Sequence, residues 1–187
     1  MSSKTRLKSG ADTVAIKGWP HFATLSFVPV YGLQNGLELP IAALTLTVLI
    51  VGNVALQFPI GWMVDHFSKR SVMLACSLMT VIFACLLPPV MGTLWMWPVL
   101  VALGANAYGI YTVSLAELGD RFHGHDLVTG ASAFALMWGV GALLGAVSAG
   151  WAMKKFGPHG LPLFLAACYA ALFLSILLRK AHPARHG

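Results

Sequence analysis

Six long apolar runs constrain this chain more than any other feature of its sequence. They cover residues 18–36, 40–64, 71–91, 95–116, 128–153 and 161–178, and Pro, Gly and charged residues separate them. A helix needs about 20 mostly apolar residues to cross the hydrocarbon layer of a bilayer. With 58% hydrophobic and only 10% charged residues among 187, no water-soluble fold could cover so much apolar surface. The sequence therefore predicts an all-α integral membrane protein with six transmembrane helices.

The basic residues set the expected orientation. With the N-terminus inside, the cytoplasmic segments contain ten cations, namely Lys4, Arg6, Lys8, Lys17, Lys69, Arg70, Arg121, Arg179, Lys180 and Arg185, and the outer loops contain two, Lys154 and Lys155. Cytoplasmic loops carry the excess of Lys and Arg, so we expect both termini to be cytoplasmic. Residues 1–17 and 179–187 would be tails of a membrane domain over residues 18–178. The net charge of +6 then reflects topology, and no nucleic acid is expected as a partner.

Polar side chains gather on two of the expected helices. The first helix has a stripe within one arc at about 100° per residue, made of His21, Thr24, Tyr31, Gln34 and Asn35. The fourth contains Asn106, Tyr111 and Glu117, with Asn106 and Glu117 on one face about three turns apart. Because unpartnered polar groups in lipid are costly, these residues either line a water-filled path or form hydrogen bonds between helices.

The other four spans differ in their small and polar residues. Asn53 and Gln57 are spaced i, i+4 in the second span, and Gly141, Gly145 and Gly150 lie in the glycine-rich fifth span. Small residues let helix backbones approach closely, so we expect the second and fifth spans to be packing helices. A glycine-rich helix without a special partner is the alternative. The third and sixth spans are almost purely apolar, and we expect them to face lipid.

A short motif occurs twice. The second span ends in GWMVDHF, residues 61–67, and the fifth ends in GWAMKKF, residues 150–156. Each copy lies at the end of the middle helix of a three-helix set, and the expected topology places the copies on opposite sides of the membrane. This pattern predicts a 3+3 inverted repeat, an arrangement that transporters use.

The loop between the second and third spans resembles the helix 2–3 signature of the major facilitator superfamily (MFS), G-x-x-x-D-[RK]-x-G-[RK]-[RK]. Gly61, Asp65, Lys69 and Arg70 match it, whereas His66 replaces a cation and Ser68 replaces a glycine. The region from residue 19 to residue 179 is similar to the C-terminal half of YcaD-like members. The resemblance implies one six-helix half of an MFS fold in the bacterial inner membrane.

The resemblance also implies a role for this loop. In the family, the loop acid lies beside the N-terminus of a helix in the other six-helix half, where the helix dipole favours a carboxylate. Asp65 would then be a latch that closes the cytoplasmic side, with Gly61, His66, Lys69 and Arg70 as its support. A plain cytoplasmic turn with a positive-inside bias is the alternative.

Family members usually have twelve helices, and this chain has six. Either it is a fragment or split half, or two copies pair so that Asp65 meets residues 127–130 of the second copy. The expected function is transport of a small solute by rocker-switch alternating access. Glu117 and His21 are candidates for proton coupling. The sequence does not specify the substrate.

Two other classes of protein are alternatives to the carrier. A non-transporting membrane scaffold or accessory subunit would need no polar stripe. An intramembrane enzyme would have to use Asp120, His123, His125 and Asp126, which we expect in one solvated loop. The sequence has no nucleotide loop, nucleophile elbow or zinc spacing, so we expect no enzyme, cofactor or metal site.

Overall fold

A computed structural model describes residues 27–121 and 125–178, with the side chains of residues 121–127 left out of the description. Residues 27–34 are helical, and five further helices follow: α2 (Leu39–His66), α3 (Lys69–Val90), α4 (Met96–Arg121), α5 (His125–Phe156) and α6 (Gly160–Leu178). These five helices are long and apolar enough to cross a membrane. The described residues contain no strand. The predicted all-helical membrane fold is confirmed.

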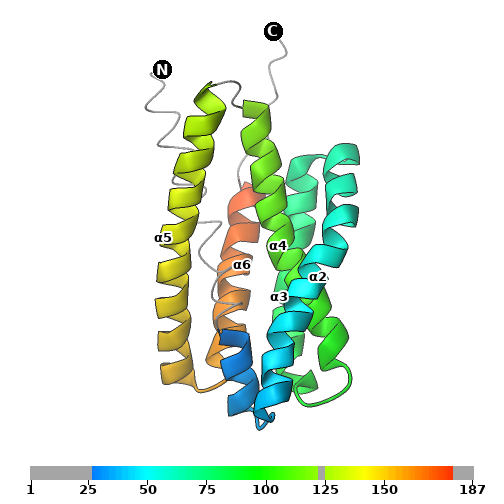
Figure 1. The fold of residues 1–187 in the computed structure, drawn as a ribbon, viewed down its shortest axis with the longest axis vertical. Helices are drawn as coiled ribbons and strands as arrows, with labels where there is room; N and C mark the ends of the chain where they lie inside the picture. Colours follow the sequence, from blue (N-terminus) through cyan, green and yellow to red (C-terminus); the bar gives the residue numbers. More distant parts are fainter. Residues whose placement is uncertain (1–26, 122–124, 179–187) are drawn as a thin grey trace.

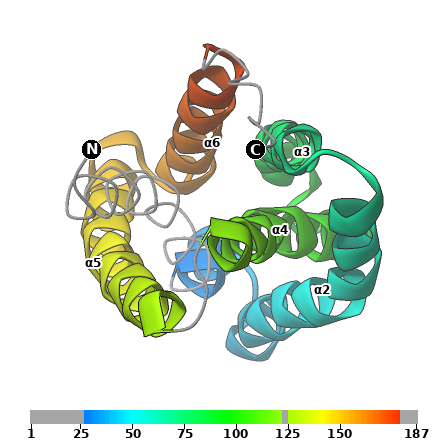
Figure 2. The ribbon, with the colours of Figure 1, turned by 90° about the horizontal axis from the view of Figure 1, so that it is seen from above.

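The bundle is centred on α4, with α2 and α3 against it and α6 beside α3 (Figure 1). The view along the bundle shows α5 at the periphery, away from α2 and α3 (Figure 2). Half of the spanning segment of α4 is buried, against 22% of that of α2 and of α5. The two helices that we expected to be packing helices therefore leave most of their surface uncovered within this chain.

Two glycines allow α2 and α4 to cross closely. A Cβ added at Gly52 would overlap the backbone of Val101, and one added at Gly104 would overlap the backbone of Leu49. Side chains larger than hydrogen cannot fit between the two helices at this point. A tight helix crossing therefore lies between α2 and α4, at two glycines outside the glycine-rich fifth span.

The expectation that the third and sixth spans face lipid is wrong for one face of each helix. α3 packs against both α4 and α6, and Ser77 and Thr80 are fully buried. Their hydroxyls donate to Met73 O at 2.7 Å and to Cys76 O at 2.8 Å within the same helix. Because these polar groups are satisfied locally, α3 can be buried in protein as readily as in lipid, and composition alone does not separate the two environments.

The two copies of the repeated motif can be compared in the structure. α2 and α5 end at opposite ends of the bundle (Figure 1). At the end of α2, the rings of Trp62 and His66 stack with centroids 4.4 Å apart. At the end of α5, the Nζ of Lys155 lies 4.9 Å from the ring centroid of Trp151. In both copies the residue four positions after the Trp covers its ring, so the two motifs repeat a local structure as well as a sequence.

Helix ends differ from those expected around residues 116–128. α4 continues to Arg121 and α5 begins at His125. Asp120 and the residues at 125 and 126 are therefore helical, and the expectation of one solvated loop is wrong for them; His123 lies outside the described residues. The extension matters because it brings Asp120 to the end of the bundle where α3 begins.

Candidate functional site

The connection between α2 and α3 lies at the end of the bundle where α4 and α6 also finish (Figure 1). Ser68 is the N-cap of α3, and its hydroxyl oxygen accepts from the Ser71 N–H at 3.2 Å. Its φ of −63° is ordinary for any residue, so this turn does not require glycine. The departure from the family signature at Ser68 therefore has a physical explanation, since serine is a preferred N-cap residue.

The two cations of the connection tie three helix ends together. Lys69 forms an ion pair with Asp120 and donates to Ala116 O at 3.1 Å, both on α4. Arg70 donates from one guanidinium nitrogen to Ile176 O at 3.0 Å and to Leu177 O at 3.2 Å. These carbonyls belong to the last turn of α6. The C=O groups of a last turn have no hydrogen-bond donor within their own helix, so Arg70 satisfies them. The loop cations thus fix the start of α3 to the ends of α4 and α6.

Asp65 is not held by these cations. It is exposed near the C-terminal end of α2, and no described residue forms an ion pair or hydrogen bond with its carboxylate. Any support of the acid by Lys69 and Arg70 is indirect, because both cations lie in the first turn of α3 and bond to α4 and α6. His66, with Nδ1 2.9 Å from Trp62 O, turns back along its own helix.

The stripe of the first helix is only partly described, since His21 and Thr24 lie outside the described residues. Tyr31 is fully buried, and its hydroxyl lies 3.3 Å from His159 Nδ1 in the connection between α5 and α6. Asn35 donates from Nδ2 to Tyr31 O at 2.8 Å, and Gln34 is exposed. Tyr31 therefore links the first helix to the connection between α5 and α6. His159, the partner that completes it, was not singled out from the sequence.

The polar residues of α4 also find partners in the protein. Asn106 donates from Nδ2 to Ala102 O at 2.8 Å, one turn back in the helix. The ring of Tyr111 lies edge-on to that of Trp138, with centroids 4.6 Å apart, and 5.6 Å from that of Phe134. Glu117 is half-buried, near the C-terminal end of α4. Tyr111 thereby links α4 to α5, which touch only sparsely elsewhere.

The residues expected on the packing helices separate into two groups. Gly141 and Gly145 are buried, and a Cβ added at Gly150 would lie 3.4 Å from the ring of Phe27 in the first helix. Gln57 donates to Asn53 Oδ1 at 3.3 Å on a surface that this chain leaves exposed. Gly61 has open space around it. Unlike a hydroxyl bonded to its own helix, an amide pair keeps donors and acceptors that one mutual bond does not satisfy, which favours a surface that does not face lipid.

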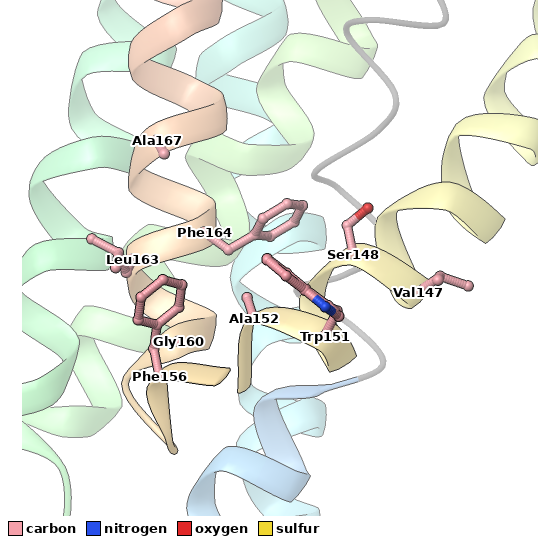
Figure 3. A pocket seen from close by; sticks show the side chains of 9 residues that line it. All are labelled: Val147, Ser148, Trp151, Ala152, Phe156, Gly160, Leu163, Phe164 and Ala167. Atoms are coloured by element: carbon pink, nitrogen blue, oxygen red, sulfur yellow. The ribbon is translucent and has the colours of Figure 1, made fainter. Parts of the chain in front are cut away.

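An apolar groove of about 540 Å³ lies between α5 and α6, away from the predicted path residues. In Figure 3, Trp151 from α5 and Phe164 from α6 reach into the space between the two helices. Val147, Phe156 and Leu163 extend its apolar wall. None of the described residues that we expected on a solute path lines this groove.

Similar proteins place the chain in a family. The sequence profile of the Major Facilitator Superfamily matches residues 14–187, and the chain belongs to this family of membrane transporters. It is a multi-pass membrane protein with the helical architecture of one MFS half. No solved structure matches the chain.

Several curated relatives are themselves described as transporters. The chain is 28% identical over 176 residues to the "Uncharacterized MFS-type transporter Ent638_1421" of Enterobacter sp. (strain 638), covering 93% of this chain and 45% of that protein. It is 26% identical to YfkF of Bacillus subtilis (strain 168), over 81% of this chain and 39% of that one. It is 27% identical to YcaD of Shigella flexneri, over 92% and 44%. The chain thus spans less than half the length of these relatives.

Proposed function

We propose that this chain acts as one half of a carrier that moves a small solute across the bacterial inner membrane by alternating access. Membership of a transporter family supports transport as the activity. The observation that carries the half-carrier proposal is the exposed surface of α2 and α5, on which the Asn53–Gln57 pair and Asp65 lie. A second six-helix half would cover this surface, and another copy of the chain could supply it.

Asp65 is the proposed latch of this carrier. A carboxylate at the C-terminal end of α2 faces the negative end of that helix dipole, which disfavours it. The positive N-terminal end of a helix in the other half would favour the same carboxylate. The contact would hold the cytoplasmic side shut and would be released when the carrier opens inward. Lys69 and Arg70 support the latch indirectly, by fixing the start of α3 to α4 and α6.

Coupling to protons is proposed through Glu117, the half-buried carboxylate of α4. His21 is the second candidate from the sequence. Both termini are proposed to be cytoplasmic, which places the Lys69–Asp120 pair at the cytoplasmic end.

The test measures the oligomeric state and the solute uptake of the same purified protein. Native mass spectrometry of the chain released from lipid nanodiscs gives its oligomeric state, and liposomes with an imposed pH gradient are screened for solute uptake. Uptake by a dimeric preparation supports a carrier of two copies. A monomer that transports would contradict the half-carrier proposal. A monomer without uptake would contradict pairing of two copies, and a dimer without uptake across the screened solutes would favour a scaffold or accessory subunit.

A further inference from the structure

The two lysines on the side expected to be extracytoplasmic are the exceptions to the charge bias of this chain. Lys154 and Lys155 lie in the last turn of α5 and form no ion pair with a described residue. Cations on the extracytoplasmic side are unfavourable for the orientation that the other basic residues predict, because Lys and Arg are normally in excess on the cytoplasmic side. Their position at a helix C-terminus is favourable, but the helix dipole does not explain why the Lys155 side chain lies over aromatic rings.

Lys155 is held at the rim of the groove between α5 and α6. Its Nζ lies 4.9 Å from the ring centroid of Trp151 and 5.6 Å from that of Phe156. Both rings line the groove, and both side chains are more than half exposed. A cation over two aromatic faces is oriented by the rings while its N–H groups stay available to an anion.

The described wall of the groove is apolar apart from the hydroxyl of Ser148 and the indole N–H of Trp151. The Ser148 hydroxyl donates to Leu144 O at 2.7 Å within its own helix. From Val147 to Phe156 the wall extends about 14 Å along the helix axis. A hydrocarbon chain matches this length and this apolar surface, and a single chain fits within the groove volume of about 540 Å³.

We propose that this groove binds an anionic phospholipid, with one acyl chain between α5 and α6 and the phosphate on Lys154 and Lys155. The position of the lysines at the end of a spanning helix coincides with the level of the headgroups. Hydrocarbon gains little by moving from the bilayer to an apolar protein surface. The preference for an anionic over a neutral phospholipid therefore comes from the headgroup charge, and the groove determines where the lipid binds. This inference does not depend on the proposed transport function.

The test measures lipid retained on the full chain by native mass spectrometry. Purified protein in detergent is titrated with dioleoyl phosphatidylglycerol or with dioleoyl phosphatidylcholine. We expect a preference for phosphatidylglycerol on the order of tenfold, since two cations contribute. The double variant Lys154→Gln/Lys155→Gln should bind the two lipids equally. Ala167→Trp, which fills the groove from α6, should reduce retention of both lipids.

The repeated motif provides a matched control. Trp151→Ala should lower retention of phosphatidylglycerol several-fold, whereas Trp62→Ala, the equivalent residue at the end of α2, should leave it unchanged. Glycerol phosphate without acyl chains should not displace the lipid. A preference that survives in the double lysine variant would overturn the proposal. The proposal would also be overturned if Ala167→Trp retained the lipid but no longer bound a second copy of the chain.

Discussion

Gly52 of α2 and Gly104 of α4 flank the point where these two helices cross, and each lies against the backbone of the opposite helix. We expect Gly52→Val to lower the free energy of unfolding by about 3 kcal/mol, because the added atoms overlap the backbone of Val101 rather than a movable side chain. Thermal unfolding in detergent, followed by the loss of the monodisperse peak, measures this change.

The control for this variant is another helical glycine. Gly139 in α5 has no described atom within contact distance of an added Cβ. Gly139→Ala should therefore leave stability unchanged or raise it by up to about 1 kcal/mol, because alanine has the higher helix propensity. Equal losses in both variants would mean that the crossing is not the tight contact that we describe.

Ser68 supplies a second prediction at the start of α3. Because its side chain caps the helix, Ser68→Ala should cost about 1 kcal/mol, whereas Ser68→Gly should cost only a few tenths. Glycine is the residue of the family signature at this position, so Ser68→Gly tests whether glycine makes the turn more stable than serine does. A clear rise in the unfolding temperature of Ser68→Gly would show that the turn is strained by serine.

The fold could be predicted from sequence because span length and charge bias act along the chain. The sequence could not show that one face of α3 is buried in protein. Ser77 and Thr80 donate their hydroxyls to carbonyls of the same helix, so nothing in the sequence indicates that they are buried. The Lys69–Asp120 pair was missed because the expected end of the fourth span, at residue 116, left Asp120 in a loop. Gly52 and Gly104 are isolated glycines, and only the crossing geometry shows that they matter.

The Lys69–Asp120 pair should contribute little to stability. The Lys69 side chain is 25% exposed and that of Asp120 is 68% exposed, so water screens their attraction. A double-mutant cycle with Lys69→Met and Asp120→Asn should give a coupling energy below about 1 kcal/mol, smaller still at high salt. Lys69→Met alone should cost more than Asp120→Asn alone, because it also removes the bond to Ala116 O. A larger, salt-independent coupling would indicate a buried pair.

Asp65→Asn separates the latch from a plain turn, because the two interpretations predict different effects on fold and transport. The carboxylate has no described partner and lies near the C-terminal end of α2, so the variant should keep its stability or gain about 0.3–1 kcal/mol. If Asp65 bonds to the other half of the carrier, solute uptake should still fall several-fold, and the paired form should loosen. The matched control is Glu38→Gln, which removes an exposed carboxylate at the opposite end of the same helix. Uptake and oligomeric state measured on both variants decide the matter: equal, small effects would support the plain turn, and a selective loss in Asp65→Asn would support the latch.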